Sequence, residues 1–285
     1  MTRLILASLA ALLLAGCQSA LFGVVNARQP AGDTVAHHDI PFDGALSLDV
    51  YSPPDAKNAP VVVFFYGGSW KSGKRQWYRW VGESLASRGI VVVIPDYRTW
   101  PKARLDGFMD DAAHATAWAR ENVAKYGGDP SRLYVMGHSA GAHIASLLAT
   151  DKQWLGKVGM QPRQLSGFIG LAGPYDFLPL KRDDFIDMFG KTPEAQARSQ
   201  PVNFVDGDEP PALLLQGDDD STVKPSNAQS LAKHYETKGE PVTLKLYPGI
   251  THMSILFALG PSKAKAPVLQ DIDTFIKTTS TPHPL

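Results

Sequence analysis

Apolar runs and amphipathic stretches alternate along the chain from Val35 onward, and this alternation limits the fold more than any other feature. Stretches such as 76–89 and 106–128 have helical spacing and end in glycine. The runs between them are short and apolar on both faces, as buried strands are: 60–68, 90–98 and 211–218. This pattern predicts the α/β class, with a mainly parallel sheet that helices cover on both faces. No linker interrupts it, so residues 35–285 are predicted to form one domain.

The first part of that domain predicts a hairpin rather than a strand–helix unit. The stretches "HHDIPF" and "LSLDVYSP" flank Asp43 and Gly44, a pair typical of a tight turn. An antiparallel hairpin is therefore expected at the N-terminal edge of the sheet. Later, residues 178–209 are irregular and polar and are short for a lid domain, so no large lid is expected.

One serine stands at a junction between a strand and a helix, in "RLYVMGHSAGAHIASLLAT". Ser139 lies between Gly137 and Gly141, which fits the G-x-S-x-G nucleophile elbow. At such a turn the glycines provide clearance, and the serine Oγ stands above the sheet edge. A serine hydroxyl becomes a useful nucleophile when a base takes its proton, so a histidine and a carboxylate are expected later in the chain.

Both partners follow in the required order. "LLLQGDDDSTV" places carboxylates directly after a strand, and "LYPGITHMS" places His252 in a loop after the next strand. Asp220 is the predicted orienter of His252, with Asp218 and Asp219 as competitors that alternatively cap backbone N–H groups. Loops at the carboxyl ends of parallel strands converge, so Ser139, Asp220 and His252 are predicted to form a catalytic triad.

An oxyanion requires N–H donors aimed at the developing charge. The residue after the nucleophile, Ala140, is one expected donor. The glycine-rich stretch "YGGSW" follows the strand at 60–65 and offers Gly68 and Ser69 as the others. A plain tight turn is the alternative interpretation of these glycines.

These motifs resemble the α/β-hydrolase superfamily over residues 45–276. Within it, the chain is similar to bacterial carboxylesterases with an H-G-G-x-W loop, near hormone-sensitive-lipase-like, acetyl-xylan and feruloyl esterases and kynurenine formamidase. The segments that carry the resemblance are "YGGSW", "PDYR", "YGGDPSRL", "GHSAG", "GPYD", "GDDDSTV" and "GITH". The resemblance implies ester hydrolysis through an acyl-enzyme on Ser139, without metal or cofactor. Tyr66 stands where those esterases have His, and it is expected either to hold the loop or to enter the pocket.

Other aromatic and histidine side chains lie near these motifs. Trp70 and Tyr175 adjoin the predicted catalytic loops and are candidates for lining the substrate pocket. His138 and His143 flank the nucleophile, but packing or hydrogen bonding is the expected role of each, because neither is positioned to act as the base.

The N-terminus predicts export and lipid attachment. Arg3 precedes the apolar segment "LILASLAALLLAG", which is about as long as the core of a signal peptide. The segment ends in "LAGC", which resembles a bacterial lipobox and makes Cys17 the predicted lipidated residue. Residues 1–16 would be the signal peptide and 17–34 a tether, and Gln18 favours the outer membrane facing the periplasm. An ordinary secretory peptide cut nearby is the alternative.

Charge excludes one class of partner. The chain has 28 basic and 28 acidic residues and no basic run, which gives no electrostatic reason for nucleic acid binding. The prediction is a membrane-anchored serine esterase acting on small-molecule, short-chain esters. The alternatives are an amidase or formamidase with the same triad, and a non-catalytic binding module on a hydrolase fold.

Overall fold

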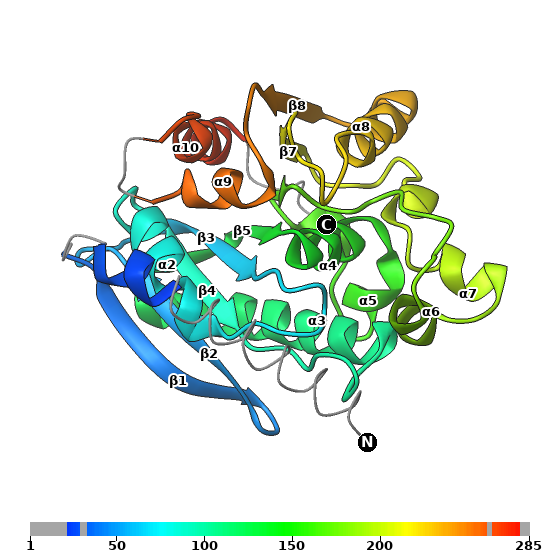
Figure 1. Cartoon of the computed structure of the whole chain (residues 1–285). Helices are drawn as coiled ribbons and strands as arrows, with labels where there is room; N and C mark the ends of the chain where they lie inside the picture. Colours follow the sequence, from blue (N-terminus) through cyan, green and yellow to red (C-terminus); the bar gives the residue numbers. More distant parts are fainter. Residues whose placement is uncertain (1–21, 29–32, 261–263, 280–285) are drawn as a thin grey trace, which may run out of the picture.

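The computed structural model describes residues 22–28, 33–260 and 264–279. Its strands form one eight-stranded sheet in the order β1-β2-β4-β3-β5-β6-β7-β8 (Figure 1). The strands are β1 Val35–Asp43, β2 Leu46–Ser52, β3 Ala59–Phe65, β4 Val91–Pro95, β5 Gly128–His138, β6 Gly167–Leu171, β7 Ala212–Gly217 and β8 Val242–Tyr247. β1 and β2 form the predicted antiparallel hairpin, and β2 runs antiparallel to β4. All pairings from β4 to β8 are parallel, which confirms the predicted α/β-hydrolase architecture.

Helices cover both faces of the sheet (Figure 1). They are α2 Arg79–Ala86, α3 Leu105–Asn122, α4 Ala140–Thr150, α5 Lys152–Gly156, α6 Asp183–Phe189, α7 Pro193–Ala197, α8 Ser226–Lys238, α9 His252–Phe257 and α10 Val268–Thr278. α3 and α4 pack together on one face, while α2 and α10 lie on the other. There Arg88, which follows α2, forms an ion pair with Asp273 of α10. Residues 178–209, predicted to be irregular, contain the short helices α6 and α7.

The central strands are buried on both faces, as their continuous apolar sequence predicts. Every residue of β4 is buried, and so are Val61 to Phe65 of β3. Each such valine or phenylalanine side chain stabilises the fold by roughly 1.5–3 kcal/mol relative to an exposed one. The rigid centre of the sheet therefore fixes where the loops at its two ends lie.

The segment before the sheet is more structured than a tether. Residues 22–28 are helical, and Phe22 is only 3% exposed. Cys17 and the predicted signal peptide lie outside the described residues. Among the described helices, none combines the length and the apolar character needed to cross a bilayer. The described residues also contain no cluster of three or more His, Cys, Asp or Glu side chains that could hold a metal ion.

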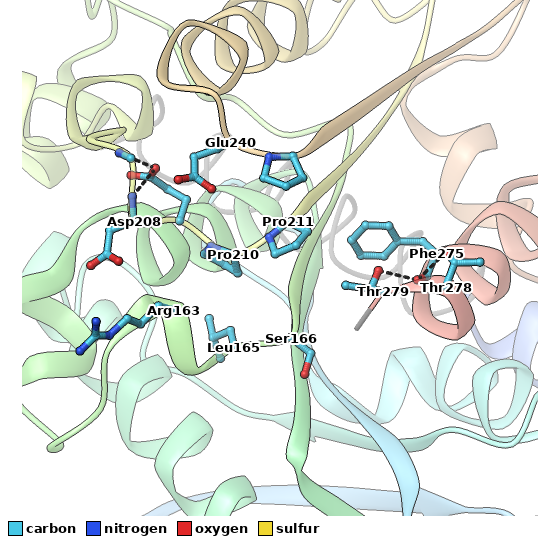
Figure 2. Close-up of a pocket in the computed structure, with 13 residues that line it drawn as sticks. Arg163, Leu165, Ser166, Asp208, Pro210, Pro211, Glu240, Phe275, Thr278 and Thr279 are labelled. Carbon is cyan, nitrogen blue, oxygen red and sulfur yellow. Dashed lines mark hydrogen bonds between the residues drawn. The ribbon is translucent and has the colours of Figure 1, made fainter. Parts of the chain in front are cut away.

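Hollows lie at both ends of the parallel strands. The larger, here called the amino-end hollow, has a volume of about 650 Å³ and is lined by Ser166, Pro211 and Pro241, which precede β6, β7 and β8 (Figure 2). The smaller, here called the carboxyl-end cavity, measures about 260 Å³. Its lining comes mainly from residues that follow β3, β5, β7 and β8, and Phe22 joins it from the segment before the sheet.

Candidate active site

Ser139 occupies the sharp turn between β5 and α4. Its backbone has φ 55° and ψ −122°, a positive φ that is uncommon for any residue other than glycine. A Cβ atom on Gly137 would overlap the backbone of Gly141, and one on Gly141 would overlap the carbonyl group of Phe65. Both glycines are therefore required by the close approach of β5, α4 and the end of β3, as the elbow motif predicts.

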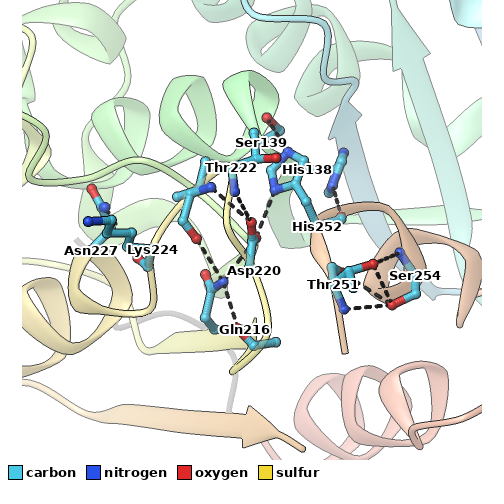
Figure 3. Close-up of polar contacts among 12 residues, drawn as sticks. His138, Ser139, Gln216, Asp220, Thr222, Lys224, Asn227, Thr251, His252 and Ser254 are labelled. Carbon is cyan, nitrogen blue, oxygen red and sulfur yellow. Dashed lines mark hydrogen bonds and ion pairs between the residues drawn. The ribbon is translucent and has the colours of Figure 1, made fainter. Parts of the chain in front are cut away.

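Ser139, His252 and Asp220 form one chain of hydrogen bonds (Figure 3). The Ser139 Oγ lies 2.9 Å from His252 Nε2, and His252 Nδ1 lies 2.8 Å from Asp220 Oδ2. Ser139 follows β5, Asp220 follows β7, and His252 follows β8. The structure thus brings the three predicted triad residues together at the carboxyl ends of the strands.

Asp220 is held as a carboxylate. Its Oδ1 accepts hydrogen bonds from the backbone N–H groups of Thr222 and Val223, both at 2.9 Å, and Gln216 Nε2 donates to Oδ2 at 3.1 Å. Burial alone would raise the pKa of Asp220, but the hydrogen bonds from His252, Val223 and Gln216 outweigh it and hold the pKa below its ordinary value. As a carboxylate, Asp220 accepts a hydrogen bond from the Nδ1–H group of His252, which leaves Nε2 unprotonated and able to accept the proton of Ser139.

The two competing carboxylates point elsewhere. Asp218 and Asp219 are exposed, and Asp218 Oδ1 accepts a hydrogen bond from the backbone N–H of Gly249 at 2.7 Å. For Asp218, this is the backbone-capping role that the sequence offered as the alternative. Asp220 differs because it is buried at 3% exposure, where its negative charge is poorly screened.

His252 begins helix α9 rather than lying in a loop, which corrects the sequence-based expectation. Thr251 precedes the helix, and its side chain and that of Ser254 cap each other's backbone N–H groups (Figure 3). The T-x-x-S spacing in "THMS" was the available signal, since it is a form of the capping box. Starting a helix at His252 fixes the direction in which its imidazole leaves the backbone.

His138 contacts the backbone of His252. Its Nε2 lies 2.9 Å from the backbone carbonyl oxygen of His252. Burial, with the neighbouring His252 as a smaller cause, lowers the pKa of His138 to about 3. The ring is therefore neutral at physiological pH, and Nε2 carries the proton that it donates to this carbonyl. Hydrogen bonding was the expected role of His138, and its partner is the backbone of the base.

The predicted oxyanion loop follows β3. Gly68, Ser69 and Trp70 all have positive φ, at 136°, 54° and 57°, and the N–H groups of Lys71 and Ser72 close the turn on the Gly68 carbonyl oxygen. Gly68 and Ser69 line the carboxyl-end cavity beside Ser139. Ala140 follows Ser139 directly and begins α4, where backbone N–H groups lack helical partners. Two of the predicted donors thus border the cavity, and the third adjoins the nucleophile in the chain.

The carboxyl-end cavity has a polar and an apolar part. The polar lining includes Ser139, His252 and Thr222. The apolar lining comes from four side chains that the sequence did not identify as site residues: Phe22, Trp77, Tyr78 and Met253. Met253 was recognisable as the neighbour of His252, whereas the other three reach the cavity through long-range packing.

Comparison with known proteins assigns the chain to a family. The family model BD-FAE matches residues 48–235. The chain belongs to the BD-FAE family. Within the matched region lie the oxyanion loop, the elbow and Asp220, whereas His252 follows it.

Two relatives and one solved structure extend the comparison. The chain is 31% identical over 251 residues to isoprenylcysteine alpha-carbonyl methylesterase of Arabidopsis thaliana, with 80% of this chain and 58% of that protein covered. It is 33% identical over 211 residues to esterase LipC of Mycobacterium tuberculosis, with 67% and 52% covered. The chain thus spans little more than half the length of these relatives. The apo form of Thermogutta terrifontis esterase 2 has a TM-score of 0.73 at 24% identity, with 90% of this chain and 98% of that chain covered, which shows a shared fold.

Tyr66 packs behind the predicted oxyanion loop of this BD-FAE protein. Its ring is 1% exposed and stacks on Tyr78 and Tyr97, with centroids 5.4 and 4.6 Å away. Its hydroxyl donates to Asp96 Oδ1 at 3.4 Å, and the Tyr97 hydroxyl donates to its carbonyl oxygen at 2.8 Å. Tyr66 was expected either to hold the loop or to enter the pocket. It does not line the cavity, so its position in the structure fits the first role.

Trp70 and Tyr175, predicted to line the pocket, lie outside the cavity lining. The positive φ of Trp70 turns its indole into the protein, where its Nε1 donates to His143 Nδ1 at 3.2 Å and its ring contacts Phe189 edge-on at 4.9 Å. Tyr175 is fully buried, with its ring edge-on to Phe168. Adjacency in sequence to a catalytic loop did not predict the side-chain direction of either residue.

His143 completes the support under the loop. It is fully buried, and its Nε2 lies 2.7 Å from the Ser199 carbonyl oxygen. Burial lowers the pKa of His143 to about 4, so the neutral ring donates from Nε2 and accepts the Trp70 indole proton at Nδ1. The core and loop-bonding role expected for His143 fits this arrangement.

Proposed function

We propose that this protein is a carboxylesterase-type serine hydrolase that cleaves carboxylic esters through an acyl-enzyme on Ser139. The hydrogen-bonded chain from Ser139 Oγ through His252 to Asp220 is the observation that carries the proposal. The relatives named as esterases and methylesterases support an ester as the substrate.

The first half of the reaction forms the acyl-enzyme. His252 Nε2 takes the Ser139 proton as Oγ attacks the ester carbonyl carbon. Asp220 orients the imidazole and stabilises the imidazolium that results. The N–H groups of Gly68, Ser69 and Ala140 hold the oxyanion, after which His252 protonates the departing alcohol.

The second half releases the acid. Water takes the place of the alcohol, and His252 removes one of its protons as the oxygen attacks the acyl carbon. Collapse of the second oxyanion breaks the bond to Ser139 Oγ, which regains its proton from His252. The bond from His138 to the His252 carbonyl keeps the imidazole in place through both halves.

The dimensions of the cavity support a preference for small esters. Its volume of about 260 Å³ lies below the range of roughly 300–1,000 Å³ found for sites that enclose drug-sized ligands. We therefore propose acyl groups such as acetyl and propionyl rather than long fatty chains.

We also propose that the mature protein is a lipoprotein attached through Cys17, facing the periplasm and located in the outer membrane. The charge, apolar segment and "LAGC" sequence of the first 17 residues support this. Incorporation of labelled palmitate into the full chain, lost in Cys17→Ser, is the expected result. Equal label in both proteins would contradict the proposal.

Hydrolysis of p-nitrophenyl acetate by Ser139→Ala tests the proposed chemistry. Removing the nucleophile is expected to lower kcat by several orders of magnitude, because His252 and the N–H donors alone cannot form an acyl-enzyme. Activity within a few fold of the unmodified protein would rule out Ser139 as the nucleophile. Ser221→Ala is a matched control, because Ser221 is exposed beside Asp220 and is expected to keep full activity.

A further inference from the structure

The helix at residues 22–28 is packed against the domain by an aromatic cluster. The Phe22 ring stacks parallel to Trp77, with centroids 5.7 Å apart and planes 9° apart. It also contacts Tyr78 at 5.0 Å and Phe257 at 6.3 Å. These partners come from the segment before α2 and from α9, so Phe22 joins two elements that border the site.

Polar contacts fix the same helix at a second point. Asn26 Nδ2 donates to the carbonyl oxygens of Gln76 and Trp77 at 3.1 and 3.4 Å. Its Oδ1 accepts the backbone N–H of Trp80 at 3.1 Å, one of the free donors at the start of α2. Arg79 Nη2 donates to the Asn26 carbonyl oxygen at 2.8 Å. The helix is therefore held in one position by both packing and hydrogen bonds.

This position makes Phe22 part of the substrate cavity. Phe22 lines the same 260 Å³ space as Ser139 and His252, and Met253 lies on the same apolar part of the lining. An ester substituent that extends from Ser139 into this part meets the Phe22 ring. The rest of the apolar lining lies in the helical turn before α2 and in α9, both of which follow strands, whereas Phe22 comes from a segment that precedes the sheet.

We propose that Phe22, held by the docked helix 22–28, is a specificity-determining residue that limits the length of the ester substituent entering the cavity. The inference rests on the proposed esterase function and adds to it a substrate class, esters with a short substituent on the side of Phe22. Removing the ring enlarges the cavity at this wall, so longer substituents are then accepted.

The test measures kcat/KM for p-nitrophenyl acetate and hexanoate, and for methyl and hexyl acetate, with the full chain in detergent. Phe22→Ala is expected to raise the long-to-short ratio in one of the two series by about tenfold, the scale on which a hydrophobic pocket discriminates chain length. Asn26→Ala removes the polar attachment outside the cavity and is expected to raise the same ratio. Val24→Ala is the matched control, because Val24 lies on the same helix and is 48% exposed.

The outcomes separate this inference from the proposed function. The inference is overturned if Phe22→Ala changes the long-to-short ratio by less than threefold, or lowers it, in both series. If Phe22→Ala does not fold, the same criterion is applied to Asn26→Ala. An equal rise in Val24→Ala also overturns it, since general loosening then explains the effect. The proposed function fails separately, if the unmodified protein hydrolyses none of the esters or Ser139→Ala retains the activity.

Discussion

The two ends of the parallel sheet contain hollows of opposite character. The hollow at the amino ends has the larger volume. Its buried carboxylate, Glu209, accepts hydrogen bonds from the backbone N–H groups of Asp206, Gly207 and Asp208 in its own loop. At the carboxyl ends, the volume is smaller, but Ser139 Oγ faces a base and lies beside the oxyanion loop. Polar groups at the amino end stabilise their own loop, whereas those at the carboxyl end are arranged around a space. Convergent chemistry therefore identifies the site, and volume does not.

After removal of the nucleophile, replacing Asp220 is expected to have the largest effect on activity, because Asp220 belongs to the polar groups arranged around the carboxyl-end cavity. Asp220→Asn is expected to lower kcat for p-nitrophenyl acetate by about 10⁴-fold, as in the serine protease precedent for this substitution. The amide can donate to His252 Nδ1, which favours the tautomer whose Nε2 carries a proton and cannot accept one from Ser139. Asp218→Asn is the control and is expected to stay within twofold, because Asp218 is exposed and bonds Gly249. A loss smaller than tenfold in Asp220→Asn would contradict the assigned role.

Replacing one glycine at each end of the sheet with alanine compares how tightly the two ends are packed. Gly141→Ala is expected to destabilise the protein by about 1–3 kcal/mol or more, because the new Cβ overlaps the Phe65 carbonyl group. Gly156 ends α5 and lines a hollow that shares Arg163 and Asp208 with the amino-end hollow. A Cβ on Gly156 meets no atom within 4 Å. Gly156→Ala is therefore expected to be neutral or to stabilise by up to about 1 kcal/mol. Urea unfolding of both variants measures this, and equal stabilities would show that the elbow is not tightly packed.

Mild acid is expected to lower the free energy of unfolding through two buried histidines near the carboxyl end of the sheet. His138 and His143 have pKa values of about 3 and 4 in the folded protein, below the ordinary value of 6.5. The unfolded chain therefore binds more protons below pH 6.5, and the free energy of unfolding falls as the pH drops from 6.5 toward 4. Between pH 6.5 and 5 the expected loss is about 2 kcal/mol for each histidine.

His143→Gln checks the origin of that loss. The amide can still accept from Trp70 and donate to Ser199 but does not titrate, so the decrease between pH 6.5 and 5 is expected to be about half as large. At the amino end the sign is opposite, because burial and the neighbouring carboxylates raise the pKa of Glu240, which favours folding as the pH falls. An unchanged pH dependence in His143→Gln, measured by chemical unfolding, would remove His143 from the explanation.

The amino end gives the smallest expected effect on activity. Glu209→Gln exchanges one acceptor oxygen for a donor facing backbone N–H groups, so it is expected to lower stability by about 1–3 kcal/mol. The kcat for p-nitrophenyl acetate is expected to stay within twofold. A larger fall in kcat with normal folding would mean that the two ends of the sheet are functionally connected.

The sequence predicted those parts of the fold and site that depend on local patterns. Buried runs and glycine-terminated helices predicted the sheet, and the spacing around Ser139 predicted the elbow that the structure contains. The order of Asp220 and His252 after successive strands was sufficient to place them near Ser139, because parallel strand ends converge.

Side-chain directions and long-range packing were beyond such patterns. The positive φ of Trp70 turns its ring away from the cavity, and no motif shows this in advance. Phe22 belongs to a segment interpreted as a tether, yet it lines the cavity because Trp77 and Phe257 pack around it. The helix that starts at His252 was missed because its capping box, from Thr251 to Ser254, was not recognised.

Covalent labelling with a fluorophosphonate, followed by peptide mass spectrometry, tests the central claim most directly. The activated serine is expected to gain one phosphonyl adduct on the peptide that contains Ser139, and Asp220→Asn is expected to slow labelling strongly. An adduct on another residue of the folded protein, or none at all, would contradict the account.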